Sequence, residues 1–191
     1  MLTACAAAPG PRHEAVAERA GLEPSWLETP PFRLRSWRRG PPAAGGELHV
    51  YLGSDGTPWI DGRRVAADPT PRTPLTLELL ARDPAPVRFL GRPCYHGTAA
   101  RPPCSAALWT GARYGEAVVA ALAEGLAAIV AQERPRRLVL VGYSGGGTLA
   151  VLLAQRVRAV DVVVTVAGNL DPPAWTAHHG YLSLEGSLEP I

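Results

Sequence analysis

The stretch LVLVGYSGGGT, residues 138–148, decides the fold class of this chain. Its four apolar residues, 138–141, have the composition of a buried β-strand, and the glycines after them mark a sharp turn. The small-residue segment at 145–157 then predicts a buried helix. A strand that turns directly into a helix is a repeating unit of α/β proteins, and Ser144 lies at the corner.

The segments around this unit extend the same pattern. Apolar runs that alternate or continue predict strands, whereas longer runs rich in Ala and Leu predict helices. The predicted strands are residues 32–37, 47–52, 87–90 and 161–167, and the other predicted helices are residues 74–82 and 115–132. The run at 161–167 is apolar almost throughout, which is typical of a parallel strand covered on both faces. Together these segments predict an α/β domain with a mostly parallel sheet flanked by helices.

Length and composition favour one globular domain. The 191 residues are 47% hydrophobic and 19% charged, enough to bury a core. Residues 1–31 are rich in Ala, Pro and Glu, with at most a short helix near 14–20, and we interpret them as a leader or linker before a domain at 32–191. The net charge of +2 and the scattered arginine pairs argue against a nucleic-acid surface. No apolar run reaches the ~18 residues of a membrane span, and the histidines lack metal-ligand spacing.

Ser144 is the candidate nucleophile. Residues 142–146 fit the pattern G-x-S-x-G between a strand and a helix, where the serine occupies a tight, strained corner. Gly142 and Gly146 are expected where a side chain would collide with the neighbouring backbone. The N–H of Gly145, at the start of the helix, would hold an oxyanion. In the alternative without catalysis, Ser144 merely caps the helix.

A dinucleotide-binding turn is a second interpretation of the same glycines. Residues 145–150 fit G-x-G-x-x-A, and Asp171 lies at about the right distance downstream to hold a ribose. The glycine run, however, begins three residues after the last apolar residue of the strand. At least two predicted strands also precede it, whereas the nucleotide motif normally belongs to the first strand–helix unit. The nucleophile interpretation is therefore favoured.

The cysteines bear on the cellular compartment. Cys94 and Cys104 bracket a short loop without periodicity, which is compatible with a disulfide or with two unpaired thiols. Residues 1–5 resemble the lipobox of bacterial lipoproteins, in which Cys5 would be lipidated, although only four residues precede it. A disulfide or a lipid anchor would indicate export, to the bacterial periplasm or as a membrane-tethered lipoprotein. If Met1 is the true start, the protein is expected in the cytoplasm.

Four motifs together resemble the α/β-hydrolase fold, and more closely a group of bacterial exported α/β hydrolases. They lie at residues 51–56, 92–110, 142–147 and 166–188. The resemblance implies a serine hydrolase that cleaves a small ester or similar acyl substrate through an acyl-enzyme on Ser144, without a cofactor. It also implies a second oxyanion donor in the loop after the strand at 47–52, from the N–H of Ser54 or Asp55.

The same resemblance implies a catalytic acid and a histidine after the nucleophile, in the order Ser, Asp, His. Both usually follow two further strands, so we expect the gene to continue past Ile191 and the 191-residue chain to be inactive alone. Asp171 with His178 or His179 is a weaker alternative. Asp171 precedes two prolines, as a helix N-cap does, and the histidines precede Gly180, as at a helix C-terminus. A catalytically silent binding protein of the same fold is the other alternative.

Overall fold

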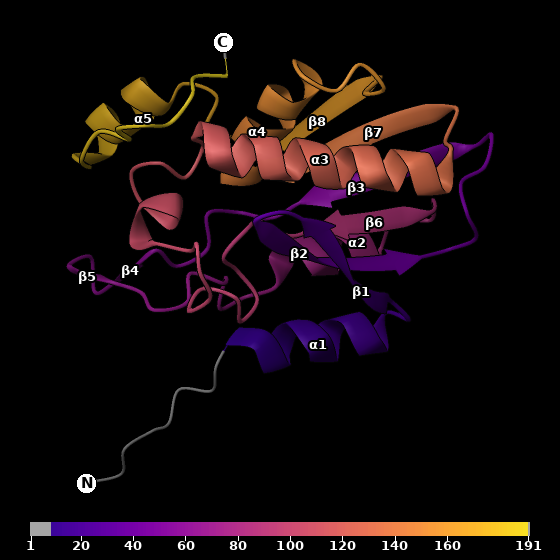
Figure 1. Ribbon diagram of the computed structural model, residues 1–191, viewed down its shortest axis with the longest axis horizontal. Coiled ribbons are helices and arrows are strands. Elements are labelled where there is room, and N and C mark those ends of the chain that lie inside the picture. The colour runs from indigo at the N-terminus through magenta and orange to yellow at the C-terminus, as the bar shows by residue number, and fades with distance from the viewer. Residues whose placement is uncertain (1–8, 191) are drawn as a thin grey trace, which may run out of the picture.

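A six-stranded sheet forms the centre of the computed structural model, which describes residues 9–190 (Figure 1). Its strands, in spatial order, are β1 (Glu23–Thr29), β2 (Phe32–Arg39), β6 (Val87–Leu90), β3 (Glu47–Leu52), β7 (Arg137–Tyr143) and β8 (Val162–Val166). The last four run parallel to one another, whereas β2 runs antiparallel to both of its neighbours, β1 and β6. A separate two-stranded ribbon joins β4 (Trp59–Ile60) to β5 (Arg64–Val65). The predicted α/β class with a mostly parallel sheet is confirmed.

Helices cover both faces of the sheet (Figure 1). Helices α1 (Pro9–Arg19) and α2 (Leu75–Ala81) pack on one face, and α3 (Glu116–Glu133) and α4 (Gly145–Ala154) pack on the other. A short 3-10 helix, Ala106–Trp109, precedes α3, and α5 (Pro172–His179) follows β8. None of the helices in residues 9–190 combines the length and the apolar character of a membrane-crossing segment.

Side-chain alternation along the central strands divides the core into two layers. On β3, Val50 and Leu52 belong to the layer under α3 and α4, and Tyr51 belongs to the layer under α1 and α2. Leu90 and Phe89 of β6 divide between the same two layers. Successive strand residues point to opposite faces, so these strands are apolar on both sides and need helices on both.

The segment 9–29 is folded, which corrects its interpretation as a leader or linker. Helix α1 buries Val16 and Ala17 and packs against α2 and β1. Strand β1 pairs with β2 over its whole length, from Glu23 opposite Arg38 to Thr29 opposite Phe32. The sequence of β1, EPSWLET, has no apolar alternation, so it lacks the pattern by which strands are found. Residues 1–8, which include the candidate lipidation site Cys5, lie outside the described residues.

The strand predicted at 161–167 is present as β8 and lies at the edge of the sheet. Within residues 9–190, β8 pairs only with β7. Helix α4 packs on β8, yet Val164 and Val166 are 42% and 40% exposed. The run of valines reports β-propensity, whereas burial depends on which neighbours cover the strand.

A disulfide joins Cys94 to Cys104, which is one of the two alternatives that the sequence leaves open. Their Cα atoms are 5.5 Å apart, within the usual range for bridged cysteines. Cys94 is buried in a small cluster with Tyr95, Ala99 and Trp109. The bridge therefore closes a loop that otherwise has no regular structure to hold it.

Candidate active site

Ser144 lies at the corner between β7 and α4, with a backbone conformation that is rare for a residue with a side chain. Its φ is 52° and its ψ is −126°. A non-glycine residue in such a region costs about 1–3 kcal/mol and persists only where its surroundings enforce it. Here the Ser144 N–H donates to the Val166 carbonyl at 2.9 Å, and the Gly147 N–H donates to the Ser144 carbonyl at 2.8 Å. The strand β8 thus holds the corner in place.

The two glycines that flank this corner have no room for a side chain. A Cβ on Gly142 would overlap the carbonyl of Gly146, the second residue of the helix. A Cβ on Gly146 would overlap the carbonyls of Leu52 and Gly53, at the end of β3. This is the crowding for which the G-x-S-x-G pattern selects glycine.

The Ser144 hydroxyl does not cap the helix. Its side chain makes no capping hydrogen bond, and the residue is partly exposed. Asp171 shows the contrast, because its carboxylate accepts from the Ala174 N–H at 2.9 Å and caps α5. Capping therefore explains Asp171, as its sequence pattern predicted, and does not explain Ser144.

The geometry also disfavours the dinucleotide interpretation. Residues 145–147 are buried and form the first turn of α4 itself. The carbonyls at the end of β3 lie against this turn, and Gly147 packs on the backbone of Gly168. A pyrophosphate needs glycines that leave open backbone in front of the helix, and here protein fills that space.

A buried ionic cluster anchors the loop after β3 beside the Ser144 corner. The Asp55 carboxylate accepts from Arg92 Nη1 at 2.6 Å, from Arg113 Nη1 at 3.1 Å and from the Tyr114 hydroxyl at 2.7 Å. The Tyr95 hydroxyl donates to the main-chain carbonyl of Asp55 at 2.8 Å. Asp55, Arg92 and Arg113 are each less than 9% exposed. The loop is therefore held by four side chains that come from other segments.

Charge balance keeps this cluster ionised. Burial by itself raises the pKa of Asp55, but the charges of Arg92 and Arg113 and the hydrogen bonds outweigh it, so this pKa lies below its ordinary value. Burial raises the pKa of Tyr95 to about 12, so its hydroxyl stays a neutral donor. Two guanidinium groups against one carboxylate leave one positive charge in excess, and Arg92 Nε has no hydrogen-bond partner.

The cluster touches the start of α4. A Cβ on Gly145 would overlap both the Asp55 carboxylate and the Tyr114 hydroxyl. An unpaired carboxylate here would oppose an anion bound at the helix N-terminus, and the two arginines neutralise it. From the sequence, Ser54 and Asp55 were predicted only as main-chain donors. The arginines and Tyr114 were not predicted, since nothing in their local sequence marks them as partners of Asp55.

The other residues considered for a triad lie at the two ends of α5, with Asp171 as its N-cap and the histidines as its last two residues. His178 and His179 are exposed, and the rings of Trp175 and Tyr181 each lie 5.3 Å from the His179 ring. Within residues 9–190, no hydrogen bond joins either histidine to Ser144. Their position at the end of the helix, before the left-handed Gly180, follows the predicted C-terminal pattern.

Comparison with known proteins identifies the fold. No protein-family profile matches the chain, and no curated protein matches it by sequence. An esterase from Pyrococcus furiosus superposes with a TM-score of 0.58 at 13% identity, over 86% of this chain and 56% of that chain. A proposed lipase from Acinetobacter baumannii gives a TM-score of 0.54 at 17% identity, over 89% and 52%. The chain has the α/β-hydrolase fold.

The α/β-hydrolase domain described here spans about half the length of these solved structures. Ser144 follows β7 at the carboxyl end of the parallel strands. This is the edge at which α/β-hydrolase enzymes carry a nucleophile on a strained strand-to-helix turn. The loop at 53–56 follows the neighbouring strand β3 at the same edge.

Proposed function

We propose that this protein is a serine hydrolase that cleaves an ester or similar acyl bond through an acyl-enzyme on Ser144. The observation that supports it best is the strained backbone of Ser144, whose hydroxyl makes no capping bond. Strain of this kind persists where function requires it, and a hydroxyl engaged in capping would be a poorer nucleophile. The fold shared with an esterase from Pyrococcus furiosus supports the same reaction class.

In this proposal the Ser144 Oγ attacks the acyl carbonyl while a general base accepts its proton. The alcohol then leaves, and water hydrolyses the acyl-enzyme to release the acid. The oxyanion of each tetrahedral intermediate accepts from the N–H of Gly145 and from a second N–H, of Ser54 or Asp55. The reaction needs only the serine, a base and water, so we propose no cofactor. His178 and His179 lie on α5 against aromatic rings, and we assign the base to neither.

The ionic cluster around Asp55 has a supporting part in the proposal. It fixes the loop that carries the second oxyanion donor, because that loop has no regular secondary structure of its own. Its excess positive charge also favours negative charge at the start of α4. Asp55 is thus a positioning residue, acting through its loop.

We also propose that the protein is exported. The Cys94–Cys104 bridge supports this, since disulfides persist outside reducing compartments. A lipid on Cys5 would tether the exported protein to a membrane surface. The small acyl substrate would then be met outside the cytoplasm.

A fluorophosphonate probe tests the nucleophile directly, using the full product of the gene. We expect covalent labelling of the wild-type protein and none of Ser144→Ala, because the alanine lacks the attacking oxygen. The matched control is Ser183→Ala, which removes an exposed serine and should leave labelling unchanged. If Ser144→Ala is still labelled, another residue is the nucleophile. If the wild-type protein resists labelling, the catalytically silent alternative is correct.

A further inference from the structure

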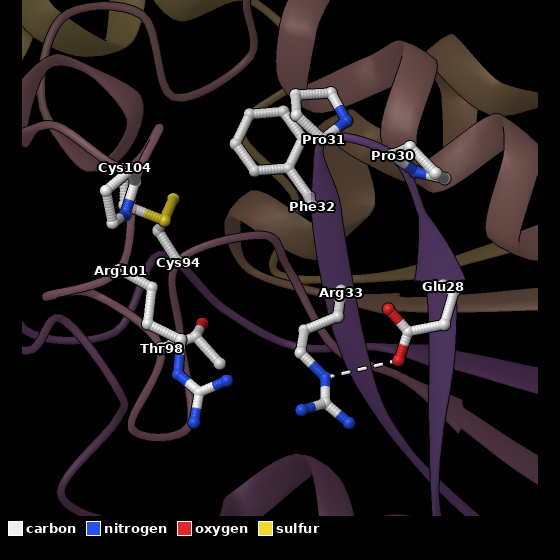
Figure 2. A pocket seen from close by; sticks show the side chains of 10 residues that line it. Glu28, Pro30, Pro31, Phe32, Arg33, Cys94, Thr98, Arg101 and Cys104 are labelled. Carbon is white, nitrogen blue, oxygen red and sulfur yellow. Dashed lines mark ion pairs between the residues drawn. A yellow bond between two sulfur atoms is a disulfide. The ribbon is translucent and has the colours of Figure 1, made fainter.

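A cavity of about 260 Å³ lies between the β1–β2 turn and the disulfide loop (Figure 2). Ser144 is not among its lining residues. The register of β2 with β6 places Phe32 beyond Leu90, so the cavity opens at the same sheet edge as Ser144. In the sheet β2 lies three places from β7, roughly 14 Å at the usual strand spacing. The cavity is therefore a separate site on the same edge.

One end of the cavity is apolar. Figure 2 shows the Phe32 ring and Pro31 at this end, facing the disulfide between Cys94 and Cys104. Phe32 packs against the cluster that contains Cys94, and the bridge ties that wall together. A wall built from prolines, a packed aromatic ring and a disulfide changes little in shape when a ligand binds, so little ordering free energy is lost.

The other end of the cavity is cationic. Figure 2 shows the guanidinium groups of Arg33 and Arg101 at this end, both lining the cavity. Glu28 forms an ion pair with Arg33 at 3.3 Å, but Arg33 Nε makes no hydrogen bond in that geometry. Within the described residues, Arg101 forms hydrogen bonds only through its backbone, and no ion pair engages its guanidinium. Two cations therefore face one carboxylate, which is exposed, and guanidinium donors are left without a partner.

We propose that this cavity binds a short-chain monocarboxylate, with the carboxylate on Arg33 and Arg101 and the chain against Phe32. Guanidinium groups bind carboxylates through paired, charge-assisted hydrogen bonds. The net charge of +1 suits a monoanion, whereas the second charge of a phosphate would meet Glu28. The volume lies just below the 300–1,000 Å³ of drug-sized ligand pockets, which favours a short chain. The site does not depend on the function proposed for Ser144.

Calorimetric titration of the protein with hexanoate tests the proposal. We expect a Kd of about 1 mM or below for hexanoate. Hexanol, which has the same chain without the charge, and inorganic phosphate, which has charge without a chain, should each bind about tenfold more weakly or worse. Equal binding of hexanoate and hexanol would overturn the role of the arginines. Phosphate binding as tight as that of hexanoate would overturn the role of the apolar end.

Matched variants separate the site from a general effect on the fold. Arg101→Gln should weaken hexanoate binding by about tenfold or more, since it removes a charge-assisted donor. Glu28→Gln should strengthen binding several-fold, because it removes the opposing carboxylate, and a damaged fold would not produce that gain. Arg63→Gln, an exposed arginine beside β5, should bind like the wild type. Undetectable binding by the wild type, or unchanged binding by Arg101→Gln, would refute the proposal.

Discussion

Asp55 joins the candidate active site to the stability of the whole domain. Its carboxylate is buried with two guanidinium groups and a tyrosine hydroxyl, and the same carboxylate lies against Gly145. A buried ion pair of this kind adds little net stability over a well-packed apolar group, but breaking it is costly. Any change at Asp55 therefore affects both the folding free energy and the geometry next to Ser144.

The substitution Asp55→Asn should lower the free energy of unfolding by about 3–5 kcal/mol, because it leaves Arg92 and Arg113 buried without a counter-charge. Urea denaturation followed by circular dichroism measures the change. Asp61→Asn is the matched control, since Asp61 pairs with Arg64 at an exposed position and should cost less than about 1 kcal/mol. Similar losses for the two variants would mean that the buried cluster is not specially dependent on its charge.

His49 should make stability fall as the pH rises. Its Nδ1 lies 2.6 Å from Asp83 Oδ2, and its Nε2 lies 2.9 Å from Glu47 Oε1. Burial lowers the pKa of His49, but the two carboxylates raise it by more than burial lowers it, so the net shift is upward. Because the folded pKa exceeds the unfolded value of about 6.5, the contribution is complete below that pH. It is lost as the pH rises through the folded pKa.

The measurement is the free energy of unfolding in urea at intervals from pH 6 to pH 9. We expect a decline in the wild type that is smaller in His49→Gln, whereas His178→Gln, at an exposed position, keeps the full decline. His96 acts with the opposite sign at the lower end of this range. Burial lowers its pKa well below 6.5, so it costs stability as the pH falls through the unfolded value of about 6.5. Because His96 is present in every variant, the difference between His49→Gln and the wild type isolates the contribution of His49. An unchanged pH profile in His49→Gln would rule out this contribution.

At the scale of elements, α1 is part of the core rather than an appendage. We expect Val16→Ala to lower the free energy of unfolding by about 2 kcal/mol, since it removes two buried carbon atoms from the layer that contains Trp37. Glu18→Ala, two residues further along and on the exposed side of the same helix, should change little. Urea denaturation of both variants makes the comparison. A negligible effect of Val16→Ala would mean that α1 is only loosely attached.

Elements with a clear apolar pattern were predictable from the sequence, and those without one were not. The strands β3 and β6 and the helix α3 fall within a residue or two of their predicted positions. Strand β1 was missed because its apolar residues Trp26 and Leu27 are adjacent and do not alternate with polar ones, and its stability comes from pairing with β2. The exposure of β8 likewise depends on its neighbours, since valine content does not say whether a neighbour covers the strand.

Part of the candidate site was predictable from the sequence and part was not, for the same reason. Ser144 and its flanking glycines are consecutive in the chain, so a short motif with its strand and helix was enough to find them. The partners of Asp55 are not consecutive: Arg92 is 37 residues away, Arg113 is 58 and Tyr114 is 59. Contacts of that kind depend on how the strands are ordered in the sheet, and no local pattern encodes them.

At the scale of the whole molecule, strand order determines at what point during synthesis the candidate site can form. Strand β3 lies between β6 and β7, and Leu52 pairs with Gly142, which is made long after it. At roughly 5–20 residues per second of synthesis, several seconds separate the two strands on the ribosome. During that interval one edge of β3 stays unpaired, and closing so long a loop is slow in any case. The speed of translation therefore sets the time between synthesis of the loop at 53–56 and its assembly with Ser144. Any chaperone that shields the nascent β3 affects the same interval.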